Sequence, residues 1–312
     1  MKKSTLLLLT VLIACGSFAQ DIQKVAKAKA EVLTAIPPDT AKAWRVQGNG
    51  SLQFSQAAFS NWSAGGQNSL GMVAWINFMT NYHHGRHVWA NTIDLGYGFT
   101  ILGKAGDAKY NKTNDKIEIT TAYGYELDQS KKWFLTVLLN FRTQFSDGFN
   151  YPDDSTVVSK FLAPGYLVAG LGITYAPAKW FYLYVSPASG RFTFVHDKWL
   201  SNAGAFGVDS GKTLRKEMGI YLRADLNKDL AKNINLSSTV ELFTNYFKGF
   251  GNIDVNWGLL LSMKVNKWLA ASIQTQLVYD DDVMVVTDPG KPGGPRTQFK
   301  ELLGLGLTYK FK

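Results

Sequence analysis

The stretch of sequence that decides the fold is VWANTIDLGYGFTI, residues 88–101. Every second residue is predominantly large and apolar, while the residues between are small or polar. The first set consists of Trp89, Asn91, Ile93, Leu95, Tyr97, Phe99 and Ile101. A period of two predicts a β-strand with one apolar face and one polar face.

The same alternation recurs along the chain from Trp44 to the end and predicts a series of strands. Their expected ranges are 44–58, 69–82, 87–102, 115–127, 132–146, 164–176, 179–194, 214–228, 232–247, 252–265, 267–280 and 297–311. Short connections mostly alternate with long ones such as 147–163 and 195–213. Short turns at one end and long loops at the other are typical of outer-membrane barrels. The pattern therefore predicts an all-β fold, a transmembrane antiparallel β-barrel of about 12 strands of the outer-membrane type.

The composition agrees with a barrel that is apolar on one face only. Aromatic residues make up 13% of the chain, there are 29 glycines, and the mean hydropathy is −0.09. Trp133, Trp180 and Trp268 each follow a lysine just after an expected short turn. Tryptophan prefers the membrane interface, so these three residues predict an aromatic girdle at the short-turn end.

The first residues indicate export. Lys2 and Lys3 precede a short apolar run, and Ser17-Phe18-Ala19 offers a cleavage site, so residues 1–19 are expected to be a signal peptide. A lipobox-like sequence ending at Cys15 leaves open that this cysteine is lipidated instead. We expect residues 20–43 to form a periplasmic arm, with a plug inside the barrel as the alternative, and residues 44–312 to form the barrel in the outer membrane of a Gram-negative cell.

Charge and cysteine content exclude several classes of protein. The net charge of +9 becomes +7 without Lys2 and Lys3, and the basic residues are scattered, which does not indicate a nucleic-acid partner. Cys15 is the single cysteine, so the expected mature chain has no disulfide. We expect no cofactor and no metal; His83, His84 and His87 cluster at an expected turn without a fourth ligand nearby.

A loop after the first expected strand carries the sequence FSNWSAGGQNS, residues 59–69. This Asn-Trp, Gly-Gly and Asn pattern resembles the N-terminal signature of the DUF3078 family, and the resemblance is expected to extend from about Trp44 to the end. It implies a barrel and no known activity. The loop is either a constrained hairpin or a recognition loop with Trp62 as a stacking platform. Its residues are Asn61, Trp62, Gly65, Gly66 and Asn68.

Charged residues on the expected polar faces point into the lumen, because charge is costly on the lipid face. The expected pore-lining residues are Arg142, Arg215, Arg223, Glu118, Glu217 and Glu241. Folding the hairpin about residues 129–130 places Glu118 opposite Arg142, a predicted cross-strand pair.

The sequence favours a porin-like protein, a narrow channel for small polar or charged solutes. The alternative is a non-enzymatic structural subunit of a larger outer-membrane assembly. The expected partners are outer-membrane lipid and either small solutes or other outer-membrane proteins. No motif links His196 to a nucleophile, so we expect no enzymatic activity and no catalytic residues.

Overall fold

The structure, a computed structural model, describes residues 43–58, 67–103, 108–266, 269–285 and 293–311. The expected signal peptide and nearly all of the expected arm lie outside the described residues. Among the described residues, no helix is both long enough and apolar enough to cross a membrane.

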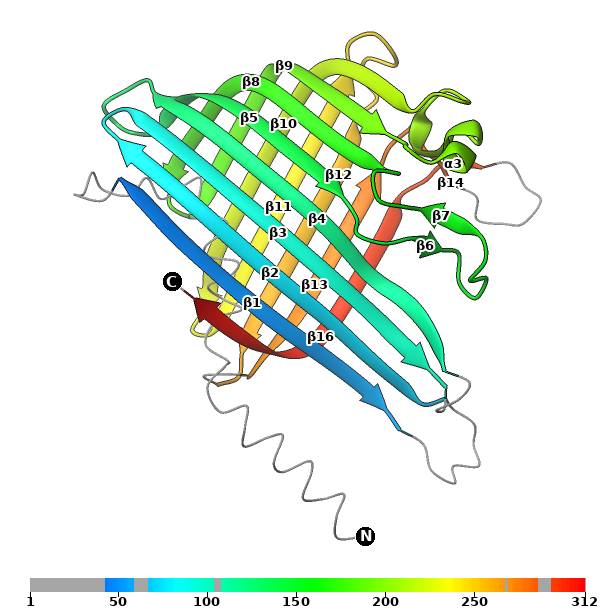
Figure 1. Cartoon of the computed structure of the whole chain (residues 1–312). Coiled ribbons are helices and arrows are strands. Elements are labelled where there is room, and N and C mark those ends of the chain that lie inside the picture. Colours follow the sequence, from blue (N-terminus) through cyan, green and yellow to red (C-terminus); the bar gives the residue numbers. More distant parts are fainter. Residues whose placement is uncertain (1–42, 59–66, 104–107, 267–268, 286–292, 312) are drawn as a thin grey trace.

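A closed antiparallel barrel of twelve strands dominates the fold, with β1 pairing to β2 on one side and to β16 on the other (Figure 1). This confirms the predicted fold. The strands are β1 (Trp44–Ala57), β2 (Ser69–His84), β3 (His87–Leu102), β4 (Lys109–Glu126), β5 (Trp133–Thr143), β8 (Gly165–Ala178), β9 (Phe181–Phe194), β10 (Leu214–Ala231), β11 (Ile234–Asn245), β12 (Asp254–Lys264), β13 (Leu269–Tyr279) and β16 (Gln298–Phe311).

Smaller elements stand in the long loops. The loop between β5 and β8 holds the hairpin of β6 (Gly148–Phe149) and β7 (Val157–Ser159), and a second hairpin joins β14 (Met284–Val285) to β15 (Gly294–Pro295). The loop between β9 and β10 contains a short helix, α3 (Lys198–Asn202), and the 3-10 turn η1 (Ala205–Gly207). None of these elements was predicted, because each has at most five residues, too few to repeat a periodic pattern.

The predicted strand ranges agree with the structure to within a few residues, except at the start of β4. That strand begins at Lys109, six residues before the predicted start at 115, and its backbone pairs there with Leu102 of β3. The extra residues are mainly polar, and the pairing shifts register at Gly98 and Phe99. Backbone hydrogen bonds extend the strand beyond the point where the apolar alternation ends.

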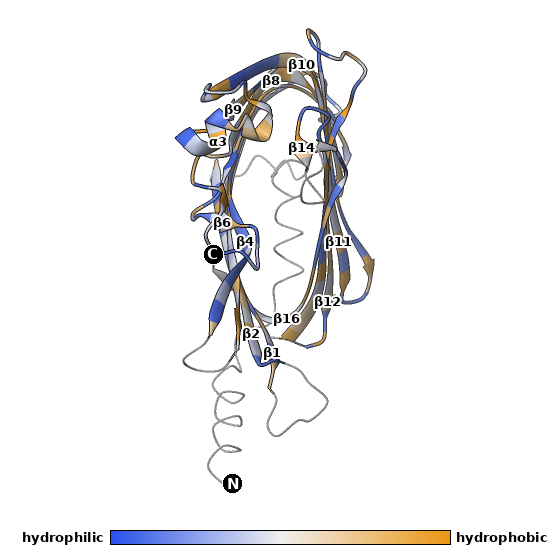
Figure 2. Ribbon diagram, turned by 90° about the vertical axis from the view of Figure 1, so that its right-hand side faces the viewer, coloured by the Kyte–Doolittle hydropathy of each residue, from blue (hydrophilic) through white to orange (hydrophobic). Residues whose placement is uncertain are grey.

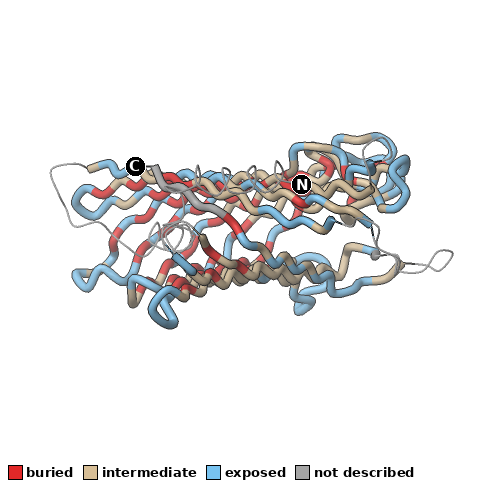
Figure 3. Tube along the Cα trace, turned by 90° about the horizontal axis from the view of Figure 1, so that it is seen from below, coloured by how far each residue is buried: buried red, intermediate tan, exposed pale blue. Residues whose placement is uncertain are grey.

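The two faces of the barrel wall have opposite chemistry, as β5 shows. Leu135, Val137 and Leu139 are 42–46% exposed on the outer face, whereas Leu138 and Asn140 on the inner face are at most 1% exposed. A water-soluble protein rarely exposes so large a continuous apolar surface, and a transmembrane barrel turns such a surface to lipid. Figure 2 shows the hydropathy of the wall, and Figure 3 shows buried and exposed positions interspersed along the strands.

Short connections lie at one end of the barrel. They are residues 85–86, 127–132, 179–180, 232–233 and 265–268. Trp44 and Trp89 pack edge to face at this end with ring centroids 5.6 Å apart, and the Lys228 ammonium lies 4.7 Å from the Trp180 ring centroid. The predicted girdle residues Trp133 and Trp180 are both about two-fifths exposed here, while Trp268 lies outside the described residues.

Candidate functional site

The inner face of the barrel brings the six expected pore-lining residues into two groups of ion pairs. The first group, the mid-barrel cluster, consists of Glu118, Arg142, Arg223, Asp225 and Glu241. The second group, the loop-end cluster, consists of Arg191, Arg215, Glu217, Asp254, Asp280 and Asp282. All six expected residues belong to one or the other.

The mid-barrel cluster joins opposite parts of the wall. Arg142 on β5 donates from Nη1 to Oε2 of Glu241 on β11 over 2.7 Å. Strands β8, β9 and β10 lie between these two strands around the wall, so the bond runs across the lumen rather than along the sheet. The barrel is a flattened oval when seen end-on, so that opposite sides of the lumen lie within reach of one long side chain (Figure 2).

Arg223 occupies the centre of the mid-barrel cluster. Its guanidinium donates to Asp225 over 2.8 Å and to Glu241 over 3.2 Å, and it lies 4.0 Å from Glu118. Only 2% of Arg223 is exposed. A buried charge is tolerated when its partners satisfy it, and it becomes costly once a partner is removed.

The structure confirms that Glu118 and Arg142 are cross-strand neighbours, as predicted. Their ionic partners include residues beyond this pair, which the prediction did not contain. Their Cα positions face each other between β4 and β5. Glu118 accepts from Asn140 over 2.9 Å and forms an ion pair with Lys116, while Arg142 reaches Glu241. Hairpin register fixes where two backbones lie, but a long arginine side chain also meets strands that are remote in sequence.

Arg191 organises the loop-end cluster. It forms two parallel hydrogen bonds to Glu217, each of 2.8 Å, a geometry that adds both strength and orientation. A further nitrogen lies 2.5 Å from Asp254, and the guanidinium lies 4.3 Å from the Phe243 ring centroid. Arg215 donates to Glu217 over 2.6 Å and to Asp282.

The loop after β13 folds inward to complete this cluster. Asp282 contacts Arg215 and also pairs with Lys248 over 2.9 Å. Burial raises the pKa of Asp280, and nearby Arg191 opposes that shift without cancelling it. Burial would also raise the pKa of Asp282, but Lys248 and Arg215 hold it below its ordinary value. The pKa values of the two loop carboxylates therefore shift in opposite directions, because Lys248 pairs with Asp282.

Sequence reasoning missed Arg191 because a bulge interrupts the period of two in β9. Tyr184 and Ser186 are buried at even positions, whereas Ser189 is buried at an odd position. The pairing of β9 with β8 and with β10 shifts register at this point. One extra residue in a strand moves all later side chains to the other face, so Arg191 enters the lumen. Pro187 and the glycine at 190 are the signals that could have indicated the irregularity.

An apolar cluster packs on the inner face of the strands from β4 to β11. Its members are Ala122, Leu138, Val168, Tyr182, Tyr184, Tyr221 and Phe243. The Tyr221 hydroxyl donates to Glu241 over 2.7 Å, which ties the apolar cluster to the mid-barrel cluster. We call this part of the barrel, β4 to β11, the filled wall.

The neighbouring strands β12, β13, β16 and β1 have a different inner face, which we call the accessible wall. Gln53, Asn256, Gln274 and Gln276 remain partly exposed there, and their side chains are neutral and polar. Gln276 donates a hydrogen bond to Asn256 over 3.2 Å, and Asn256 donates one to Glu241. Both side chains therefore lie in the lumen near Glu241.

A second bridge crosses the lumen, and it joins the accessible wall to the filled wall. Lys300 on β16 donates from Nζ to Asn114 on β4 over 2.9 Å. Strands β1, β2 and β3 lie between these strands around the wall. Lys300 and Asn114 were not among the expected site residues, because their pairing depends on the closure of the barrel and not on any local pattern.

The expected recognition loop is described in part. Asn61, Trp62, Gly65 and Gly66 lie outside the described residues, and Asn68 accepts a hydrogen bond from the Gly103 amide at its carbonyl oxygen over 2.9 Å. The role of this loop stays a prediction.

In the described part of the chain, the histidine cluster and one carboxylate trio also have metal-binding chemistry. The His87 Nδ1 lies 2.6 Å from the Tyr123 hydroxyl, and the His83 ring is buried. Among the described residues, carboxylate oxygens of Asp254, Asp280 and Asp281 lie within 4.8 Å of one another. Arg191 already pairs with the first two, at 2.5 and 3.6 Å, so this trio is part of the loop-end cluster.

The predicted family resemblance is confirmed for part of the chain. Residues 54–149 match the family model described as a protein of unknown function (DUF3078), a range that runs from β1 into β6. The match is shorter than the range from Trp44 to the end that the sequence led us to expect. No curated protein matches the chain.

Several solved outer-membrane barrels are similar to the chain. An outer membrane channel from Pseudomonas putida F1 shares 12% identity, with 88% of this chain and 99% of that chain covered and a TM-score of 0.38. The NanC porin shares 6% identity, with 85% and 100% covered and a TM-score of 0.36. The translocator domain of the autotransporter NalP from Neisseria meningitidis shares 9% identity, with 91% and 94% covered and a TM-score of 0.32. Likenesses at these scores support no functional assignment.

Proposed function

We propose that this protein is a narrow outer-membrane channel for small polar or charged solutes, and that the solute passes along the accessible wall. The observation that carries the proposal is a difference in side-chain exposure between two parts of the inner face. Leu138, Tyr182 and Tyr184 on the filled wall are at most 1% exposed, whereas Gln274 and Gln276 on the accessible wall remain partly exposed inside a closed barrel. Neutral polar side chains can exchange hydrogen bonds with a passing solute without holding it tightly.

We propose a second role for the charged clusters, which is to set the electrostatic field along the proposed passage. Arg142 on β5 is one quarter exposed while it pairs with Glu241 on β11, the strand of the filled wall that neighbours β12 of the accessible wall. A charge at a constriction with low-dielectric surroundings acts strongly on nearby ions. We infer that Arg142 influences ion selectivity and that Arg223, which is buried, mainly holds the clusters together.

The second candidate function is the structural subunit, and the loop between β11 and β12 favours it. Phe247 and Phe250 are 82% and 65% exposed there, and the Tyr246 and Phe250 rings stack with centroids 6.0 Å apart. Exposed aromatic residues are common anchors of protein interfaces. Such an interface fits another outer-membrane protein as the partner.

Single-channel conductance of the purified protein in a planar bilayer tests the channel. Stable conductance steps support it, and Arg142→Glu is expected to shift the ion selectivity toward cations. The matched control is Arg86→Glu, because Arg86 lies in an exposed turn between β2 and β3 and bonds to the Leu127 carbonyl. A folded barrel that conducts no ions contradicts the channel and favours the subunit.

A further inference from the structure

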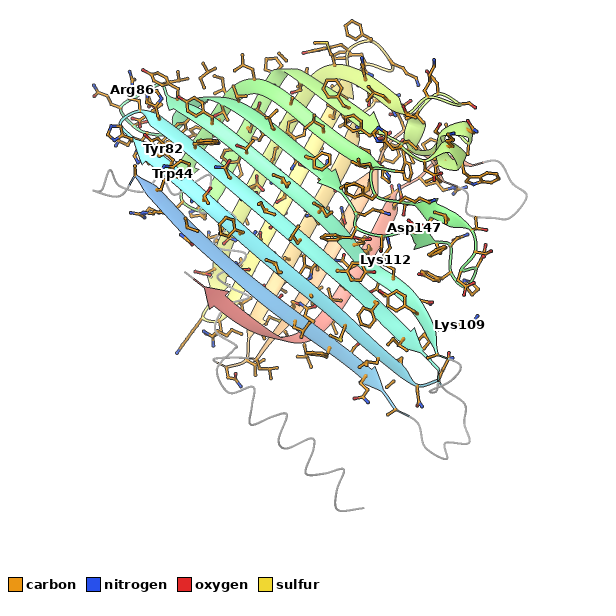
Figure 4. All side chains as sticks on the ribbon, viewed as in Figure 1. Trp44, Tyr82, Arg86, Lys109, Lys112 and Asp147 are labelled. Atoms are coloured by element: carbon orange, nitrogen blue, oxygen red, sulfur yellow. The ribbon has the colours of Figure 1, made fainter. Side chains whose placement is uncertain are left out.

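The loop between β5 and β8 does not fold into the lumen. It turns outward, and its hairpin β6–β7 lies beside the end of β4 that projects toward the long loops (Figure 1). Figure 4 shows Lys112 of β4 and Asp147 of this loop close together on the outside of the barrel. The pairing of β5 with β4 ends at Thr143, which lies opposite Ile117. The residues of β4 before Ile117 therefore have no β5 partner.

Several hydrogen bonds fasten the loop to β4. The Lys112 ammonium donates to the Ser146 carbonyl and to Asp115, each over 2.8 Å. The Lys112 amide donates to the Tyr151 hydroxyl over 3.0 Å, and Asp115 accepts from the Phe145 amide over 2.7 Å. These bonds hold the loop in one position before any ligand arrives, which lowers the entropic cost of binding.

Between the loop and the strands lies a cavity of about 260 Å³. Four aromatic residues contribute to its lining, Tyr97, Tyr110, Phe149 and Tyr151. The Tyr97 and Tyr110 hydroxyls lie 2.9 Å apart, and the Phe149 and Tyr151 ring centroids lie 6.1 Å apart. Ligand sites for drug-sized molecules span roughly 300–1,000 Å³, so this cavity has room for a single ring-sized group.

The charged groups that line the cavity limit which chemical classes of ligand can bind there. Asp147 and Asp154 are exposed carboxylates, and the charge of Lys112 is matched by Asp115. A phosphate group would meet repulsion from the two carboxylates, and a metal cation would pair with the carboxylates but leave most of the aromatic surface uncovered. A neutral ring with several hydroxyl groups avoids the repulsion and uses both kinds of lining group. It can donate to the carboxylates and pack its apolar face on the aromatic rings.

We infer that this outer pocket binds the pyranose ring of a saccharide, either free or carried by a glycolipid of the outer leaflet. The position of the pocket fits both sources, because it opens on the outside of the wall at the long-loop end. Tyrosines that face outward at a barrel rim lie at the membrane interface, where glycolipid sugars stand. The pocket lies outside the lumen, so this inference does not depend on channel activity.

Calorimetric titration of the full mature protein in detergent tests the free source with methyl β-D-glucopyranoside and methyl N-acetyl-β-D-glucosaminide. A cosedimentation assay tests the lipid source with vesicles of phosphatidylethanolamine with and without lipopolysaccharide. Binding to a glycoside shows that the pocket takes a free saccharide. Binding only to the vesicles that contain lipopolysaccharide shows that it takes a glycolipid.

The variants Asp147→Asn and Tyr110→Ala are each expected to weaken that binding about tenfold, which corresponds to about 1.4 kcal/mol. Trp199→Ala is the matched control, because Trp199 is an aromatic residue 73% exposed on another loop at the same end. Heat-dependent migration in gels verifies that each variant is a folded barrel. The inference is overturned if no glycoside binds the folded wild type and both kinds of vesicle bind equally or not at all, or if the variants bind as tightly as the wild type.

Discussion

The filled wall and the accessible wall of this barrel belong to one continuous sheet, yet their inner faces carry different chemistry. On the filled wall, Leu138, Tyr182 and Tyr184 are at most 1% exposed, and Arg223 lies among carboxylates. On the accessible wall, Gln274 and Gln276 remain partly exposed and neutral. The comparison teaches that a small barrel can pack one part of its inner face tightly while side chains on another part stay partly exposed.

The largest effect is expected from Arg223→Met. This change removes the buried arginine partner of Asp225 and one of the two arginine partners of Glu241, so the free energy of unfolding should fall by about 3–5 kcal/mol. Urea unfolding of the protein in phosphatidylcholine vesicles, followed by tryptophan fluorescence, measures it. Lys264→Met on the accessible wall is the control, with an expected loss below about 1 kcal/mol. Equal losses for the two variants would contradict the division into two walls.

A matched pair of leucines sharpens the comparison. Leu138→Ala empties a fully buried position and should cost about 2–5 kcal/mol. Leu260→Ala removes an inner-face side chain that is already partly exposed on the accessible wall, so it should cost about 1 kcal/mol. The same urea titration measures both. Similar values would mean that the lumen is packed to the same degree along both walls.

The proposed passage is tested by Gln276→Trp. The indole should obstruct the accessible wall and lower single-channel conductance by about tenfold. Tyr182→Phe removes one hydroxyl from the filled wall, so it should leave the conductance unchanged. A channel that responds to the second change and not to the first would place the passage elsewhere.

The smallest effect concerns α3, which lies outside both walls. Asp197 caps this helix by accepting from the Leu200 amide over 3.0 Å, and that bond together with Lys160 lowers the pKa of Asp197 below its ordinary value of 3.8. A lowered carboxyl pKa contributes stability above the ordinary pKa, and this stability is lost as the pH falls through the folded-state pKa. Protection of the Leu200 amide from hydrogen exchange should therefore be higher at pH 6 than in strong acid.

The substitution Asp197→Ala should remove this pH dependence and cost the helix about 1 kcal/mol. Asp209→Asn in the same loop is the control. If the pH dependence of Leu200 protection survives in Asp197→Ala, another group is responsible for it.

Much of the candidate site could be predicted because alternate residues of a strand face opposite sides of the sheet, and this alternation is visible in the sequence. Arg142, Arg223 and Glu241 were placed in the lumen by counting alternate positions, and the structure has them there in ion pairs. The count failed for Arg191, where a bulge inserts one residue. A bulge changes the parity without changing the composition of the strand, so local alternation does not register it.

The outer pocket shows a second kind of limit. Lys112 precedes the predicted start of its strand, and Tyr151 belongs to a loop with no periodic pattern. Their contact depends on how a long loop settles against a projecting strand. Loop conformations follow from a few specific hydrogen bonds, such as the 3.0 Å bond from the Lys112 amide to the Tyr151 hydroxyl, and not from periodicity.

The sequence by itself determined the strands, their inward and outward faces and the antiparallel barrel, because a period of two is a property of each strand alone. Only the tertiary structure decided that Arg142 meets Glu241 and that Lys300 meets Asn114. Those pairs join strands that are far apart around the wall. Their contact follows from the closure and flattening of the barrel, which depend on all twelve strands together.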